Sequence, residues 1–453
     1  MSLIFYNTAS RRKEEFRPLE EGKVHARSAI VFDVLVRYLR AKGFNVTYVR
    51  NFTDVDDKII KKANELGKDT TWVAEYYIKA FYEDMEQIGV LKADVEPRAT
   101  EHIGGMIEMV QTLLAKGYAY VEGGDVYFSV EKFEDYGRLS GRKLEDMQAG
   151  SRIAVDERKR HPMDFALWKA AKPGEPQWDS PWGPGRPGWH IECSVMSNHY
   201  PHHENERAQS IAANGGRFAN FWIHNGFVTV ESEKMSKSLG NFITIRDALA
   251  EYHPEVLRLF LLSKHYRSPV DFSEKAVGAI QSGLVRIYRT LERMEEAIGP
   301  GPTAESMVSH ALLEGSNPSP FLARFEEVMD DDLNTAGAVG LMFEKVREIN
   351  KLLDSFGTGT GEKQEMLRVE REDLLRAGAI LGLLQRTPKR FFEELPQKMV
   401  DIDPSEIQRL IAQRAEARAK KDWATADKIR DQLKAKGVVL EDGPEGTTWR
   451  LDV

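Results

Sequence analysis

The stretch EKMSKSLGN, Glu233 to Asn241, places two lysines and two serines in a short, glycine-containing loop. Lys234 and Lys237 are compact, flexible positive charges that can follow a phosphate group as negative charge develops on it. Ser236 and Ser238 add hydroxyl donors, and the N–H groups at the start of the helix expected after the loop add more. The stretch predicts a polyphosphate-binding loop. For two lysines at this spacing alone, a solvated basic turn is the alternative.

Upstream of this loop, helices and strands alternate. Residues 25–42 have helical periodicity and end at Gly43, residues 44–49 are predicted as a strand, and Asp56 to Leu66 as a helix. This order is typical of α/β domains with a doubly wound parallel sheet. Residues 221–230 are predicted as the last strand of that sheet. A strand before the first helix is missing, because residues 8–24 contain no apolar run of strand length.

The composition limits the class of protein. A chain of 453 residues is too long for one core, and we expect about two to four domains. The net charge of -8 excludes a global positive field, so contacts with nucleic acid must come from local basic patches. Cys193 is the single cysteine, which excludes an internal disulfide and fits a reducing cytoplasm. No apolar run is long enough to span a membrane, and we expect a cytoplasmic protein.

The remaining segments predict three further units. Residues 118–121 and 125–128 form a hairpin around Gly123 and Gly124, and residues 137–182 are mostly loop. From residue 243 the chain is helical, with a linker at residues 299–302. We therefore expect the two halves of the α/β domain at residues 1–118 and 186–245, with an insertion between them at residues 119–185. A helical stem-contact region is expected at residues 246–300, a helical bundle at residues 301–400, and a small α+β domain at residues 401–453.

The last of these segments carries the densest run of basic residues. Its predicted helical hairpin and the connection between its helices contain Arg409, Arg414, Arg418, Lys420, Lys421, Lys428, Arg430, Lys434 and Lys436. A solvated helix face and an RNA-backbone contact are both consistent with such a run.

Cys193, His202 and Glu206 form a second candidate site. Pro201 at a helix start places His202 and Glu206 one turn apart on one face. Thiolate, imidazole and carboxylate all bind zinc, but zinc prefers four ligands. On these residues alone, a polar helix start beside one buried cysteine is the competing interpretation.

Six stretches together resemble cysteinyl-tRNA synthetase, a class I aminoacyl-tRNA synthetase, in order over nearly the whole chain. They are KMSKSLGNF, RPGWHIECS, PHHENERAQS, RNFTDVDDKIIKKANE, ERKRHPMDFALWK and ARAKKDWATADKIRDQL. The resemblance implies a class I catalytic domain, a helical anticodon-binding bundle and a small C-terminal domain that recognises tRNA. It implies that ATP, with magnesium, activates L-cysteine to an adenylate, that the acyl group passes to tRNA-Cys, and that the protein is a monomer.

The resemblance also implies roles for individual residues. Lys234 and Lys237 match the catalytic loop that steadies the pyrophosphate, with Ser236 and Lys237 on ATP. Trp189 and Thr53 match residues near the amino-acid pocket. The family's zinc holds the substrate thiolate, and three of its four protein ligands match the chain. These ligands are Cys193, His202 and Glu206.

Two departures from the family pattern fall on the active site. Between Val24 and His25 the family has its first strand, the turn Y-V-C-G-P-T-V-Y-D with a zinc ligand, and the start of the H-I-G-H signature. His25 corresponds to the last residue of that signature. Between Tyr200 and Pro201 the family has a strand and the adenosine loop F-D-I-H-G-G-G. We expect the helices flanking these strands to lose packing partners, because central parallel strands are buried on both faces.

These departures predict a cysteinyl-tRNA synthetase scaffold that is catalytically defective, with an incomplete zinc site and an intact tRNA-binding half. One alternative is an active cysteine–tRNA ligase whose site is completed by other segments. Another is a non-catalytic tRNA-binding protein. A third, the cysteine ligase of mycothiol synthesis, is disfavoured because a tRNA-recognition domain would have no use there.

Overall fold

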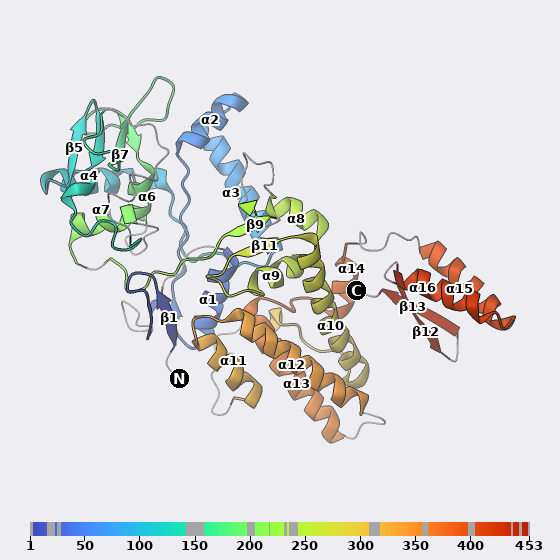
Figure 1. Ribbon diagram of the computed structural model, residues 1–453. Helices are drawn as coiled ribbons and strands as arrows, with labels where there is room; N and C mark the ends of the chain where they lie inside the picture. Colours follow the sequence, from blue (N-terminus) through green and yellow to red (C-terminus); the bar gives the residue numbers. More distant parts are fainter. Residues whose placement is uncertain are drawn as a thin grey trace.

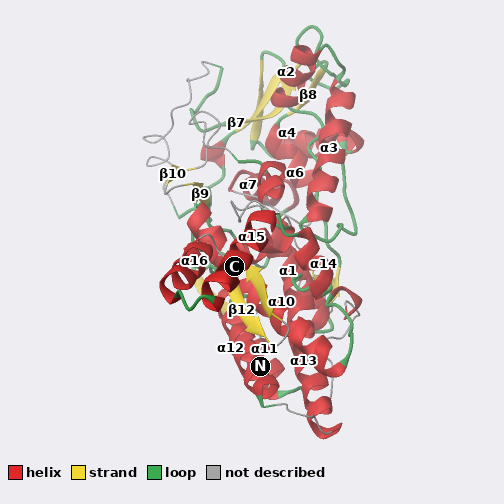
Figure 2. Cartoon of the chain, turned by 90° about the vertical axis from the view of Figure 1, so that its right-hand side faces the viewer, coloured by secondary structure: helices red, strands yellow, loops and turns green. Residues whose placement is uncertain are grey.

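The computed structural model describes residues 3–15, 23–24, 29–141, 158–196, 204–216, 218–230, 233–234, 243–307, 318–355, 361–396, 404–435, 438–443 and 446–451. An antiparallel sheet with its helices lies at one end, an α/β centre packs on a helical bundle, and a small C-terminal unit lies to the side (Figure 1). Turned by 90°, the antiparallel sheet and the bundle lie at opposite ends of the molecule (Figure 2). None of the helices within these ranges is long and apolar enough to cross a membrane.

The centre has the expected α/β character. Strand β3 (Lys23–Val24) pairs in parallel with β4 (Asn45–Val46), and helix α1 (Ala29–Ala41) connects them. Strand β9 (Val228–Val230) pairs in parallel with β11 (Val270–Phe272) and antiparallel with β10 (Glu233–Lys234). Single parallel bridges join Val49 to Val95 and Phe52 to Arg98. Within the described residues, the parallel sheet thus consists of short pairs.

The prediction that residues 8–24 hold no strand is wrong. Strand β2 (Arg12–Glu15) pairs antiparallel with β1 (Ile4–Asn7), and β3 follows. The side chains of β2 are charged and largely exposed, so the strand has no apolar pattern to reveal it. Only two residues belong to β3, which leaves the first parallel strand of the domain very short.

The antiparallel sheet has its own core. Strands β5 (Ala119–Glu122), β6 (Asp125–Phe128), β7 (Phe165–Ala170) and β8 (Gly185–Pro187) are ordered as they occur in the sequence. Gly123 and Gly124 have positive φ, which confirms the predicted hairpin. Helices α4 (Ile103–Ala115), α6 (Trp189–Met196) and α7 (Glu204–Asn214) complete this core.

Helices α2 (Asp57–Leu66) and α3 (Thr70–Gln87) follow one another and pack together, and Asp57 of α2 pairs with Lys169 and Arg186 of the antiparallel sheet. The bundle is built from capped helices. Its members are α8 (Ile245–Glu251), α9 (Pro254–Leu262), α10 (Glu274–Ile298), α11 (Pro320–Asp330), α12 (Thr335–Asp354), α13 (Gly361–Leu381) and α14 (Pro388–Glu394). Ser273, Ser319 and Asn334 accept hydrogen bonds from the first turns of α10, α11 and α12.

The C-terminal unit is a small α+β unit with the predicted helical hairpin, followed by a hairpin of two strands. Helices α15 (Pro404–Ala419) and α16 (Trp423–Ala435) pack on each other, and β12 (Val438–Gly443) pairs antiparallel with β13 (Gly446–Leu451). Its small core of Ile407, Leu410, Ile411, Ile429 and Leu433 is separate from the other two cores.

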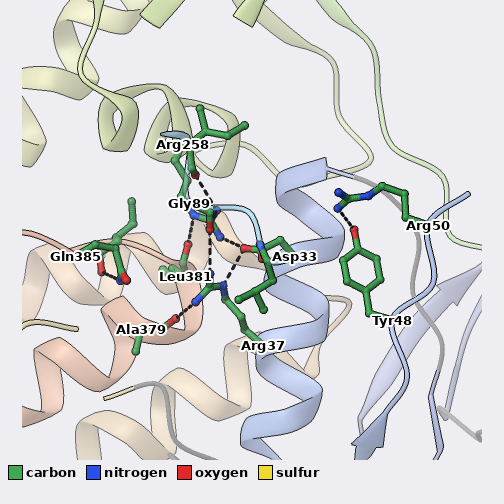
Figure 3. Close-up of polar contacts among 12 residues, drawn as sticks. Asp33, Arg37, Tyr48, Arg50, Gly89, Arg258, Ala379, Leu381 and Gln385 are labelled. Carbon is green, nitrogen blue, oxygen red and sulfur yellow. Dashed lines mark hydrogen bonds and ion pairs between the residues drawn. The ribbon is translucent and has the colours of Figure 1, made fainter. Parts of the chain in front are cut away.

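A buried ion pair joins α1 to the bundle. Asp33 on α1 and Arg258 on α9 are almost completely inaccessible to solvent and lie in direct contact (Figure 3). Arg258 also donates to the carbonyls of Leu381 (2.6 Å), Ile88 and Gly89 (3.2 Å each). The expectation that helices beside the missing strands lose their partners is wrong for α1, because α9 and α13 pack against it.

Replacing Arg258 tests this junction. We expect Arg258→Met to lower the free energy of unfolding by about 3–5 kcal/mol, because Asp33 keeps a buried charge with fewer partners. The control is Arg324→Met, which breaks an exposed pair with Glu344 and should cost less than about 1 kcal/mol. Urea unfolding followed by circular dichroism measures both. Equal losses in the two variants would contradict the role of the buried pair.

His253 gives the protein a pH-dependent stability. It caps α9 by accepting from the Glu255 N–H, it contacts the Phe391 ring, and Arg386 and Glu394 face its imidazole. Burial lowers the pKa of His253 to about 4, so the folded state favours the neutral ring. The unfolded chain takes up a proton near its ordinary value of 6.5, and stability is lost as pH falls through this window.

We expect His253→Asn to keep the cap and flatten the pH dependence of unfolding between about pH 4 and 6.5. The difference in slope between the two proteins should approach about 1.4 kcal/mol per pH unit. Urea unfolding at several pH values measures it. Parallel curves for the two proteins would show that His253 is not the titrating group.

Candidate functional site

The structure describes part of the predicted site. Thr53, Trp189, Cys193 and Glu206 lie within the described residues. For Lys234 only the backbone is described, as the second residue of β10. His25, His202, Ser236 and Lys237 lie outside the described residues, so their predicted roles stay predictions.

Cys193 and Glu206 lie on neighbouring buried helices. Cys193 on α6 is 3% exposed and Glu206 on α7 is 2% exposed. The two helices pack against each other, as the predicted ligand set requires. Asn51 reaches the same place from the loop after β4, and its Nδ2 donates to Cys193 Sγ at 3.8 Å. The thiol of Cys193 and the amide of Asn51 thus come together from separate segments, and Glu206 lies on the helix that packs against α6.

His190 is the residue of this site that the sequence interpretation missed. Its Nδ1 lies 2.6 Å from Glu206 Oε1, and its Nε2 lies 2.9 Å from Asn205 Nδ2. Gln209 donates to the His190 carbonyl at 2.5 Å. The signal was present in the sequence, because His190 stands three residues before Cys193 and so shares a helix face with it.

Thr53 adjoins a buried carboxyl group. Glu192, next to Cys193, is fully buried, and burial raises its pKa to about 9. Thr53 lies near this carboxyl group and opposes part of the rise in its pKa. Burial therefore favours the neutral form of the Glu192 carboxyl group.

Trp189 lies on the open side of the site. Its side chain is 59% exposed although it begins helix α6, and its ring lies 5.2 Å from the His190 ring. An exposed indole beside a buried polar cluster can cover a small ligand, because it offers a large apolar face. The predicted place of Trp189 near an amino-acid pocket stays a prediction.

The described donors do not by themselves fit a zinc site. Among the residues that the structure describes, no three histidine, cysteine, aspartate or glutamate side chains are arranged to hold a metal ion. Glu206 is engaged by His190, and the third predicted ligand, His202, lies outside these residues. We therefore assign no chemical step to zinc.

Matches to known proteins first identify the class of protein to which the chain belongs. Residues 22–282 match the tRNA synthetases class I (C) catalytic domain, and residues 324–385 match the DALR domain. The structure is similar to Mycobacterium tuberculosis methionyl-tRNA synthetase in complex with methionyl-adenylate. The TM-score is 0.50 and the identity 14%, over 83% of this chain and 92% of that one. At this identity the likeness shows the fold alone, that of a class I aminoacyl-tRNA synthetase.

The family follows from closer relatives. Residues 404–450 match the cysteinyl-tRNA ligase anticodon binding domain. The cysteine–tRNA ligase of Syntrophobacter fumaroxidans is 50% identical over 500 residues, and that of Geobacter metallireducens is 50% identical over 488 residues. Both alignments cover all of this chain and all of the relative. The chain belongs to the cysteine–tRNA ligase family, which implies ATP, cysteine and tRNA-Cys as the family's substrates.

The metal content of the purified protein tests the zinc prediction. We expect well under one zinc ion per chain after dialysis, because three ligands hold zinc less tightly than the four of a closed site. Inductively coupled plasma mass spectrometry measures it, with Cys193→Ser as the control that should have the same low content. One zinc per chain in the native protein, lost in Cys193→Ser, would contradict the prediction.

Proposed function

We propose that this chain is a cysteine–tRNA ligase scaffold that binds tRNA-Cys but forms no cysteinyl-adenylate. The family reaction joins L-cysteine to tRNA-Cys with release of AMP and pyrophosphate. Lys234, Lys237 and Ser236 would hold the phosphates of ATP, with His25 as the remnant of the other signature. Thr53 and Trp189 would contact cysteine, and the incomplete set of Cys193, His202 and Glu206 would bind zinc weakly.

A difference in length from the relatives supports the loss of activity. The alignment with the Syntrophobacter fumaroxidans enzyme extends over 500 residues, whereas this chain has 453. Some residues of that relative therefore have no counterpart here, although the alignment covers both chains completely. The two-residue β3, directly before the first predicted gap, fits the same interpretation.

Formation of the adenylate is sensitive to the loss of active-site residues. Charge develops on the phosphates in the transition state, and donors on both sides of the nucleotide must be in place beforehand. Removing one preorganised donor typically costs about 10²–10³ in rate. Groups that act as a unit are not replaced by those that remain. Lys234 and Lys237 without most of their partner signature would therefore give little adenylate.

The C-terminal unit supports the tRNA-binding part of the proposal. The side chains of Lys421 and Lys428 are exposed and form no ion pair with a described residue. The prediction is wrong for Arg414, which is 9% exposed and therefore lies in the unit rather than on its surface. Exposed lysines that neutralise RNA phosphates make binding depend on salt.

Cysteine-dependent ATP–pyrophosphate exchange tests the loss of activity. We expect no exchange above a blank without cysteine, together with tRNA-Cys binding that weakens steeply as salt rises. The intact mass of the purified chain is checked first, and the Geobacter metallireducens enzyme serves as positive control. Exchange clearly above the blank would show an active cysteine–tRNA ligase, with the site completed by other segments.

Lys421→Gln combined with Lys428→Gln locates the tRNA contact. We expect about tenfold weaker binding and a salt slope smaller by about two. Lys389→Gln, an exposed lysine on α14, is the matched control. Unchanged binding in the double variant would place the contact elsewhere. Absence of both exchange and tRNA binding would contradict the whole proposal.

A further inference from the structure

A cavity of about 660 Å³ lies where α3, α9 and the loop after α13 meet. Its lining includes the chain from Met85 to Lys92, the start of α9 at His253 to Glu255, and residues 382–386 in part. None of the described residues of the candidate cysteine site lines it. The volume is in the range of pockets that hold small molecules and cofactors.

Arg50 brings a buried positive charge to this cavity. Its residue exposure is 6%, and its guanidinium turns from the segment after β4 toward Tyr48 and α1 (Figure 3). One amino group donates to the Tyr48 hydroxyl, but Nε makes no hydrogen bond with any described residue. The guanidinium lies 5.1 Å from the rings of both Tyr48 and Phe81. Among the described residues it has no carboxylate partner, which is unusual for a buried charge.

None of the described acids that line the cavity forms an ion pair with Arg50, and Glu96, which lies behind the lining, accepts a hydrogen bond from the Tyr82 hydroxyl at 2.6 Å. Lys92 adds a second cation, 5.5 Å from the Tyr82 ring. Glu255 is buried, and its oxygens accept from Tyr288, Leu384 and Gln385. Two further arginines are already engaged, by Asp33 and by Glu394. The remaining acids of the lining, Glu86 and Glu305, are exposed.

We propose that this cavity binds a small phosphorylated molecule up to the size of a nucleotide, with its phosphate on Arg50 and Lys92. A guanidinium and an ammonium together match a group that carries two negative charges. The start of α9 also adjoins the cavity and favours an anion. Tyr82, Met85 and Ile88 supply an aromatic and apolar wall for the rest of the ligand.

The same short segment serves this cavity and the candidate cysteine site. Successive side chains of an extended segment point to opposite faces. Arg50 faces the cavity, while Asn51 donates to Cys193 on the other side. The Arg50 backbone N–H is fixed by the Val95 carbonyl at 3.0 Å. A phosphate on Arg50 would therefore hold in place the segment that carries Asn51 and Thr53.

Calorimetric titration with pyrophosphate tests the proposal. The full chain carries Lys234→Gln and Lys237→Gln in every sample, so that the EKMSKSLGN loop is not the source of binding. At constant ionic strength, we expect Arg50→Gln to weaken binding by about tenfold or more and Lys92→Gln by severalfold. Lys79→Gln, an exposed lysine of α3 outside the lining, should leave it unchanged.

Thermal unfolding and circular dichroism check that each variant is folded. If Arg50→Gln does not fold, the Lys92→Gln variant tests the proposal, because Lys92 is exposed. A parallel titration with AMP distinguishes the ligand type. Binding of AMP that depends on Lys92 supports a nucleotide, and binding of pyrophosphate alone supports an inorganic polyphosphate. Failure of both probes to bind at millimolar concentration would overturn the proposal. Equal affinity in the Lys92→Gln and Lys79→Gln proteins would also overturn it.

Discussion

The ion pair of Asp33 and Arg258 is the constraint on which the arrangement of the chain depends. Two charges removed from water stabilise a fold only when every remaining donor and acceptor is also used. Arg258 meets this condition through backbone carbonyls at the end of α13 and in the loop after α3, and Asp33 also accepts from Arg37 and from the Leu91 N–H. Helix α1, the loop after α3, α9 and the end of α13 are therefore fixed relative to one another.

This junction explains how α1 stays buried beside a very short first strand. Val34, Val36, Tyr38 and Leu39 are all fully inaccessible to solvent. These residues share one hydrophobic core with the bundle helices. Bundle helices therefore cover α1, which a longer sheet would also be expected to cover. Tyr38 adds a hydrogen bond of 2.6 Å to Asp330 at the end of α11. The α/β centre therefore draws much of its packing from the bundle.

The sequence predicted the features that arise from local patterns. Apolar periodicity located α10 and α12, glycines located the β5–β6 hairpin, and the C-terminal unit was predicted as a whole. The sequence did not predict the features that depend on contacts between residues far apart in the chain, or those that have a polar pattern. Strand β2 is charged, and Asp33 and Arg258 are 225 residues apart. In the site, Cys193 and Glu206 were predicted, whereas the contact of His190 with Glu206 forms only where α6 lies against α7.

Loss of chemistry and loss of fold need not occur together in such a chain. Stability is the sum of many small contributions, and three separate cores share it here. Catalysis depends on a few groups held together at one place, and those groups do not substitute for one another. The gaps proposed before α1 and before α7 would therefore act mainly on the chemistry, because Arg258 and the bundle hold α1 and the antiparallel sheet holds α7. A tRNA-binding half outside both gaps can keep its function.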